Sequence, residues 1–100
     1  MIFQFSNECL ELMKEKGKKN IIVEIATSDS SDFEITELHV HLIKDKDVEF
    51  FVRKKGFTCK EADGIKVLLP NYKLEYAPVI SFGVKKVLFF RVLTYEGIKL

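Results

Sequence analysis

Two histidines and a carboxylate provide the first candidates for chemistry. His39 and His41 lie two positions apart in the alternating segment 33–43 (FEITELHVHLI), and Glu37 precedes them at the same spacing. Side chains two apart on a strand point to the same face, so these groups would lie together. Imidazole and carboxylate are ligands of zinc or nickel. The shell is incomplete, however, and the pattern favours the solvent-facing side of a strand over a metal site.

The polar stretch just before this segment offers oxygen ligands. Asp29, Asp32 and Glu34 fall in or next to the run TSDSSD, residues 27–32. Their spacing lacks the glycine and the final glutamate of an EF-hand loop. Serine and aspartate also form turns by bonding to their own backbone. We therefore predict a turn over 27–32 and no calcium site.

The two cysteines are the candidate thiols. Cys59 is followed by Lys60, whose charge could lower the pKa of the thiol and make it nucleophilic. No histidine lies nearby in sequence to act as a base, which favours a strand cysteine without a redox role. Cys9 falls in the first turn of an expected helix, on an apolar stripe with Leu12 and Met13, and core packing is favoured. Two cysteines are too few for a disulfide framework, and they form no CxxC motif.

The motifs of several enzyme classes are missing from the sequence. There is no G-x-S-x-G elbow, Walker loop or GxGxxG fingerprint. We expect no enzymatic activity, although a site assembled only in space would leave no such motif.

The amino-acid composition argues against some classes of binding partner. Sixteen Lys and Arg against fifteen Asp and Glu leave almost no net charge, which argues against nucleic-acid binding. No apolar run approaches the ~20 residues of a membrane span, and the first residues are too charged for a secretory signal. We expect one cytoplasmic domain over residues 1–100, with reduced thiols and no membrane partner.

Hydrophobic periodicity predicts an α+β domain, mainly β, with an N-terminal helix. The helix is expected over 7–16, with Ser6 as N-cap and Gly17 as its stop. A second short helix is predicted over 47–55, with Asp47 as N-cap and Gly56 as stop, against a β-rich composition. Strands are expected in the segments 2–5, 20–26, 33–43, 57–60, 65–70, 78–83 and 87–100, the last two separated by a break at Gly83 and the Lys85–Lys86 pair.

This order of elements resembles the A-type iron–sulfur carrier, or HesB-like, family. The likeness lies in the first strand, the capped helix ending in KGKKN, the hairpin, and the segment DGIKVLLPNYKLEYAPVISFGVKKVLFFRV. Together with the alternating segments, it implies two small packed sheets, a HesB-like sandwich or flattened barrel, spanning nearly the whole chain. The family holds iron through three cysteines, one in the first hairpin and two near the C-terminus.

The residues at the corresponding positions of this chain differ from the family's ligands. The hairpin loop reads TSDSSD and the tail reads TYEGIKL, so neither contains a cysteine. Cys9 and Cys59 match neither position. The resemblance therefore implies a domain that has lost iron–sulfur ligation, has no cofactor, and serves as a non-enzymatic binding or assembly module. The alternative is an iron–sulfur or metal site rebuilt from Cys59, Cys9 or the His39/His41 pair.

The C-terminal segment suggests self-association. Read as one strand, it is apolar on both faces: Val87, Phe89, Arg91 and Leu93 on one, and Leu88, Phe90, Val92 and Thr94 on the other. A domain this small has one core and can bury only one of the two rows. We expect a homodimer, or a contact with another protein, at or near Phe89 or Phe90. The alternative is a monomer in which the helix over 47–55 covers the second row.

Overall fold

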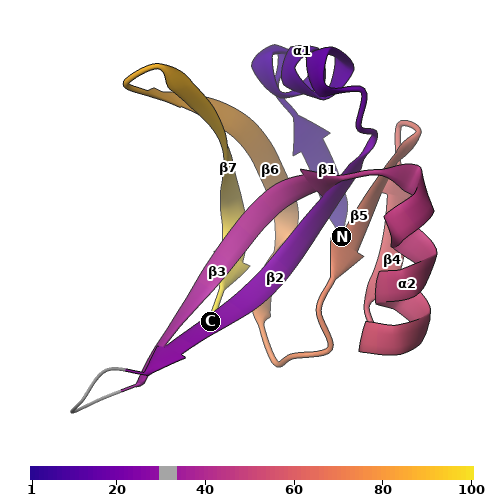
Figure 1. Ribbon diagram of the computed structural model, residues 1–100, viewed down its shortest axis with the longest axis vertical. Coiled ribbons are helices and arrows are strands. Elements are labelled where there is room, and N and C mark those ends of the chain that lie inside the picture. The colour runs from indigo at the N-terminus through magenta and orange to yellow at the C-terminus, as the bar shows by residue number, and fades with distance from the viewer. Residues whose placement is uncertain (30–33) are drawn as a thin grey trace.

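The computed structural model describes residues 1–29 and 34–100 (Figure 1). As expected, the fold is α+β and mainly β, and it comprises the following elements in chain order: β1 (Ile2–Phe5), α1 (Asn7–Lys16), β2 (Asn20–Asp29), β3 (Glu34–Ile43), α2 (Asp45–Lys55), β4 (Thr58–Ala62), β5 (Ile65–Leu69), β6 (Glu75–Val87) and β7 (Phe90–Lys99).

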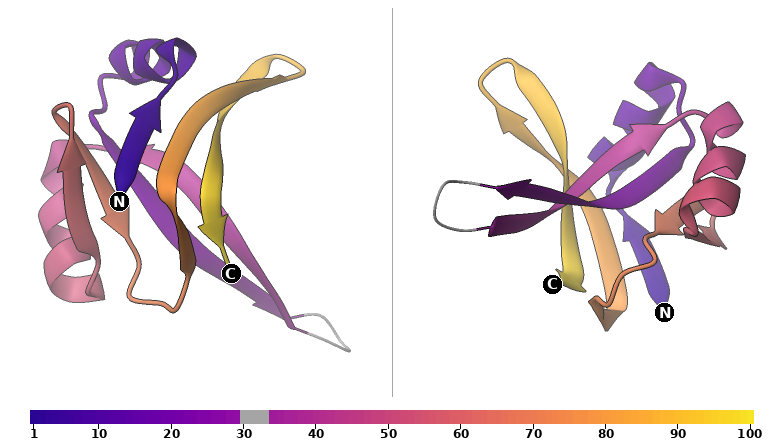
Figure 2. Two further views of the ribbon diagram at one scale, coloured as in Figure 1. Left: turned by 180° about the vertical axis from the view of Figure 1, so that it is seen from behind. Right: turned by 60° about the horizontal axis from the view of Figure 1, so that its bottom comes forward.

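The strands form two sheets that pack face to face, which confirms the predicted architecture. One sheet has the order β1-β6-β7 and the other the order β3-β2-β5-β4. Figure 2 shows both from two further directions, with α2 on the far side of the four-stranded sheet. The main core lies between the sheets and includes buried Phe82 and Ile80 of β6, Val23 of β2 and Val67 of β5.

The four-stranded sheet is covered on both faces, which explains the apolar runs in its central strands. In β2, Ile21 and Val23 face the main core, whereas Ile22 joins a second cluster with Val48 of α2. Leu68 of β5 packs into the same second cluster. Strands buried on both faces lose the alternation of apolar and polar residues.

The helix α1 begins and ends where the sequence predicts. The Ser6 Oγ accepts a hydrogen bond from the backbone N–H of Cys9 over 3.1 Å. Gly17 ends the helix in the left-handed region, at φ 64°. A residue with a Cβ is strained there, which is why glycine is common at this position.

The second predicted helix is present, although its start was predicted wrongly. α2 begins at Asp45, with Lys44 in the N-cap position, so Asp47 lies inside the helix. The reason is a contact that the local sequence does not reveal: the buried Asn20 side chain donates a hydrogen bond to the Asp45 carboxylate. Gly56 ends the helix at φ 73°, as expected.

The β2–β3 hairpin is longer than predicted. Its antiparallel register extends from Asn20 opposite Ile43 to Asp29 opposite Glu34. Residues 27–29, which we expected in the turn, therefore belong to β2, because cross-strand pairing continues past the apolar part of the segment. The rest of the predicted turn, with Asp32, lies outside the described residues.

The C-terminal segment departs most from the expectation. β6 runs unbroken through Gly83 and the Lys85–Lys86 pair, and the chain reverses at Leu88–Phe89 between paired Val87 and Phe90. Gly83 lies within the strand, and a Cβ there would lie only 3.0 Å from the Thr94 hydroxyl, so its small size serves packing and not a break. The prediction of one strand over 87–100 was therefore wrong.

The alternative in which the helix over 47–55 covers the second row of this segment is contradicted by the position of α2. α2 packs on Ile22 and Leu68 of the other sheet, and its buried Val48 belongs to that cluster.

No helix in the described part of the chain is long and apolar enough to cross a membrane.

Candidate functional site

Among the residues that the structure describes, the most exposed large apolar side chains lie at the end of the β6–β7 hairpin. Leu88 is 81% exposed, Phe89 is 95% exposed and Phe90 is 70% exposed. Val87 and Val92 flank these three and are each 43% exposed. We call Leu88, Phe89 and Phe90 the hairpin tip. Figures 1 and 2 show that this hairpin projects from the body of the molecule, beyond the strands of the other sheet.

The backbone conformation at the tip is one that normally favours glycine or asparagine, not the residue found there. Two residues, Leu88 and Phe89, connect the paired positions Val87 and Phe90. Leu88 has φ 54°, in the left-handed region where such loops normally place glycine or asparagine. A residue with a Cβ costs about 1–2 kcal/mol in that region. The tip thus displays a leucine at a position where local conformation favours glycine.

Positive charges border the tip. Lys85 and Lys86 precede it on β6 and are exposed, and Arg91 follows it on β7, opposite Lys86. The segment from 83 to 95 contains no acidic residue. Arg91 donates a hydrogen bond to the Glu15 carboxylate of α1, which connects the hairpin, just behind its tip, to the helix.

The structure places both histidines on the exposed face of β3, as the alternation predicts. The Nε2 of His39 lies 3.3 Å from the Glu37 carboxylate, and the Nε2 of His41 lies 2.9 Å from the Glu24 carboxylate. Glu24 was not among the predicted site residues. Its signal was the hairpin register, which sets it opposite His39 and diagonal to His41. Within residues 1–29 and 34–100, no three His, Cys, Asp or Glu side chains are grouped so as to hold one metal ion.

The two cysteines occupy different environments. Cys9 is fully buried in the main core, as its apolar stripe predicts, and this burial raises the pKa of its thiol. Cys59 lies on β4, an outer strand of the four-stranded sheet, and is exposed. Its predicted strand position is confirmed.

The chain is similar to a solved structure. SufA from Escherichia coli, described as involved in the biosynthesis of iron–sulfur clusters, is 10% identical in sequence, with a TM-score of 0.46. The match covers 96% of this chain and 80% of that chain. No protein-family model and no curated protein matched the chain. The likeness to SufA assigns no activity to this protein.

Proposed function

We propose that this protein is a HesB-like module without enzymatic activity, which acts by binding protein, and that its contact surface is the hairpin tip. The observation that carries the proposal is the exposure of Leu88, Phe89 and Phe90 at the end of a projecting hairpin. Exposed apolar groups gathered in this way mark interfaces in soluble proteins. The simplest partner is a second copy related by a two-fold axis, which would place each tip against the other.

The energy available from the tip is modest. Burying one Leu or Phe side chain fully contributes about 1.5–3 kcal/mol. Association also costs several kcal/mol in lost freedom of motion, so three such side chains support a weak, reversible dimer. The flanking Val87 and Val92 would extend the contact along both strands.

The HesB-like part of the proposal is supported by the order of elements along the chain. The loss of cluster ligation is supported by the sequence at the two positions where that family has cysteines. Here they read TSDSSD and TYEGIKL. An iron–sulfur cluster requires soft thiolate ligands, and serine or tyrosine hydroxyls do not provide them.

The experiment is light scattering across a dilution series, with wild type compared with Phe89→Asp and Phe90→Asp. We expect wild-type mass to rise above 11.6 kDa with concentration, and both variants to remain at that mass. Phe50→Asp is the matched control, because Phe50 is an aromatic residue 51% exposed on α2, away from the tip. A monomer at every concentration would overturn self-association. Association that survives both tip variants would place the interface elsewhere.

A second candidate is a metal site at the histidine pair. The observation in its favour is that His39 and His41 share an exposed face, each with a carboxylate at its Nε2. Anaerobic expression with iron and sulfide, followed by absorption spectroscopy and metal analysis, tests this function. A brown protein with stoichiometric iron would favour a rebuilt cluster site over the binding module. Zinc that is retained by wild type and lost in His39→Ala/His41→Ala would favour the histidine site.

A further inference from the structure

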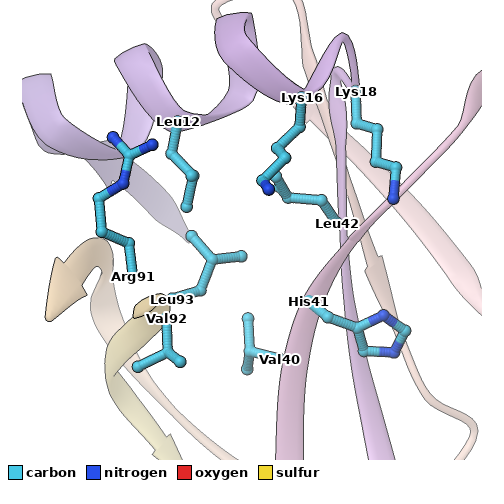
Figure 3. A pocket seen from close by; sticks show the side chains of 9 residues that line it. All are labelled: Leu12, Lys16, Lys18, Val40, His41, Leu42, Arg91, Val92 and Leu93. Atoms are coloured by element: carbon cyan, nitrogen blue, oxygen red, sulfur yellow. The ribbon is translucent and has the colours of Figure 1, made fainter. Parts of the chain in front are cut away.

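A cavity of about 410 Å³, which we call the wedge, opens between the two sheets, and Figure 3 shows the side chains that line it. Two outer strands form its walls: β3 of the four-stranded sheet and β7 of the three-stranded sheet. α1 closes one end through Leu12, which is 4% exposed. Val40, His41 and Leu42 line the wedge from β3, and Val92 and Leu93 line it from β7. Apart from His41, the side chains that these two strands and Leu12 contribute are apolar.

Positively charged side chains lie at the edge of this apolar cavity. Lys16 lies at the end of α1, Lys18 follows Gly17, and Arg91 lies on β7. Glu15 pairs with Arg91 and offsets its charge. Neither lysine forms an ion pair with a carboxylate in the described ranges 1–29 and 34–100. The wedge thus has an excess of positive charge at the end where α1 terminates.

An apolar interior with unpaired cations at one end fits a ligand with the opposite arrangement. We infer that the wedge binds a medium-chain carboxylate, with its hydrocarbon chain against Leu12, Val40 and Leu93 and its carboxylate at Lys16 and Lys18. The ammonium groups would donate charge-assisted hydrogen bonds to the carboxylate oxygens. The chain would cover apolar surface that water now contacts.

The volume sets the size of the ligand. Pockets for small molecules occupy about 300–1,000 Å³, and this wedge falls at the lower end of that range. At about 30 Å³ per heavy atom, the share of a molecule in liquid water, the space holds roughly a dozen heavy atoms. Decanoate has this size and matches the required charge, so it is the probe.

The hairpin tip of a second copy is a poorer occupant of the wedge. That tip is also apolar, but Lys85, Lys86 and Arg91 border it. Insertion would bring these cations beside Lys16 and Lys18, and like charges in contact are unfavourable. The wedge adjoins the tip at Arg91 and Val92, but the ligand is held by other residues, so this inference does not rest on the proposed function.

The test is calorimetric titration of the full chain with decanoate below its micelle concentration, with amide chemical shifts recorded by NMR. We expect saturable binding, with shifts centred on residues 16–18, 40–42 and 91–93. Lys16→Gln/Lys18→Gln should weaken binding about fivefold, the loss for two exposed charge pairs. The matched control is Lys46→Gln/Lys54→Gln, which removes two exposed lysines of α2 and should leave affinity unchanged.

Two further ligands separate the contributions of charge and chain. Butyrate keeps the carboxylate without most of the chain, and decyltrimethylammonium keeps the chain with the opposite charge; both should bind more weakly than decanoate. The inference is overturned by an absence of saturable decanoate binding, by equal binding of the decyl cation, or by an equal loss in the α2 control. Phe89→Asp, which tests the tip, should bind decanoate as wild type does.

Discussion

Asn20, the first residue of β2, donates a hydrogen bond from Nδ2 to the Asp45 Oδ1, at the first residue of α2, over 2.8 Å. The same nitrogen donates to the Ile43 carbonyl over 3.2 Å. Asn20 is 1% exposed and is the one buried polar residue among those described. The Asn20 amide therefore connects the start of β2 to the start of α2, at the two ends of the β2–β3 hairpin.

Removing this amide should destabilise the protein. Asn20→Ala leaves the Ile43 carbonyl without its partner and opens space in a closed site, so we expect the free energy of unfolding to fall by about 1–3 kcal/mol. Asn20→Asp should be at least as damaging, because it places a carboxylate against Asp45. Urea denaturation measures both. Asn71→Ala, at an exposed asparagine, is the control, and an equal loss there would contradict the role given to Asn20.

Leu88→Gly should stabilise the fold but weaken self-association through the tip. Glycine adopts φ 54° without the strain of a Cβ, and we expect a gain of about 1 kcal/mol in the free energy of unfolding. Leu88→Ala is the matched control, since it also removes the leucine side chain but keeps the Cβ. Thermal and urea unfolding at low protein concentration compare the two variants. Equal stability of Gly and Ala would show that the backbone at the turn is unstrained.

Self-association through the tip should strengthen with salt. Two tips in contact bring Lys85 and Lys86 of one copy towards those of the other, and counterions screen this repulsion. Sedimentation at about 50 and about 500 mM NaCl should therefore give the tighter dimer at the higher concentration. The opposite trend would indicate a partner surface with acidic groups.

The cysteines should react at very different rates. Exposed Cys59 is expected to react with a thiol reagent in the native state, whereas buried Cys9 should react only after unfolding. Mass spectrometry of the labelled native and urea-unfolded protein distinguishes one modified thiol from two. Rapid labelling of both in the native protein would contradict the burial of Cys9.

Burial of Cys9 also predicts a pH dependence. It raises the pKa of the thiol above its ordinary value of 9.0, so above that pH the unfolded chain loses a proton that the folded chain keeps. The contribution to stability is full below pH 9.0 and falls as the pH rises through the folded pKa. Cys9→Ala should reduce this alkaline loss in urea titrations, after its lower overall stability is subtracted. An unchanged slope would assign the loss to other groups.

Local signals predicted most elements of this fold. Ser6 and Gly17 fix the ends of α1 through backbone hydrogen bonding and φ, both of which depend on nearby residues. The start of α2 could not be predicted in this way, because Asp45 is held by Asn20 from another element. The turn at Leu88–Phe89 was missed for a related reason. Its residues contradict turn preferences, and only the pairing of β6 with β7 locates the reversal.

The candidate sites likewise contain some residues that local sequence could place and others that only the tertiary structure brings together. Alternation placed His39 and His41 on the exposed face correctly, since strand geometry alone decides it. Glu24 became their neighbour only through the hairpin register. The wedge combines residues from three elements, and no spacing in the sequence brings Leu12, Val40 and Leu93 together.

The parallel pairing of β1 with β6 has a consequence for how the chain reaches this structure. Ile2 lies opposite Val79 and Phe5 opposite Phe82, so the first strand has its only described strand partner at the far end of the chain. Gln4 and Ser81, whose side chains are hydrogen-bonded, are 77 residues apart. Closing so large a loop has a high entropic cost before the contact forms, and folds dominated by such pairings fold slowly. During synthesis, Phe3 and Phe5 emerge first and lack the Phe82 ring on which they stack until most of the chain has left the ribosome.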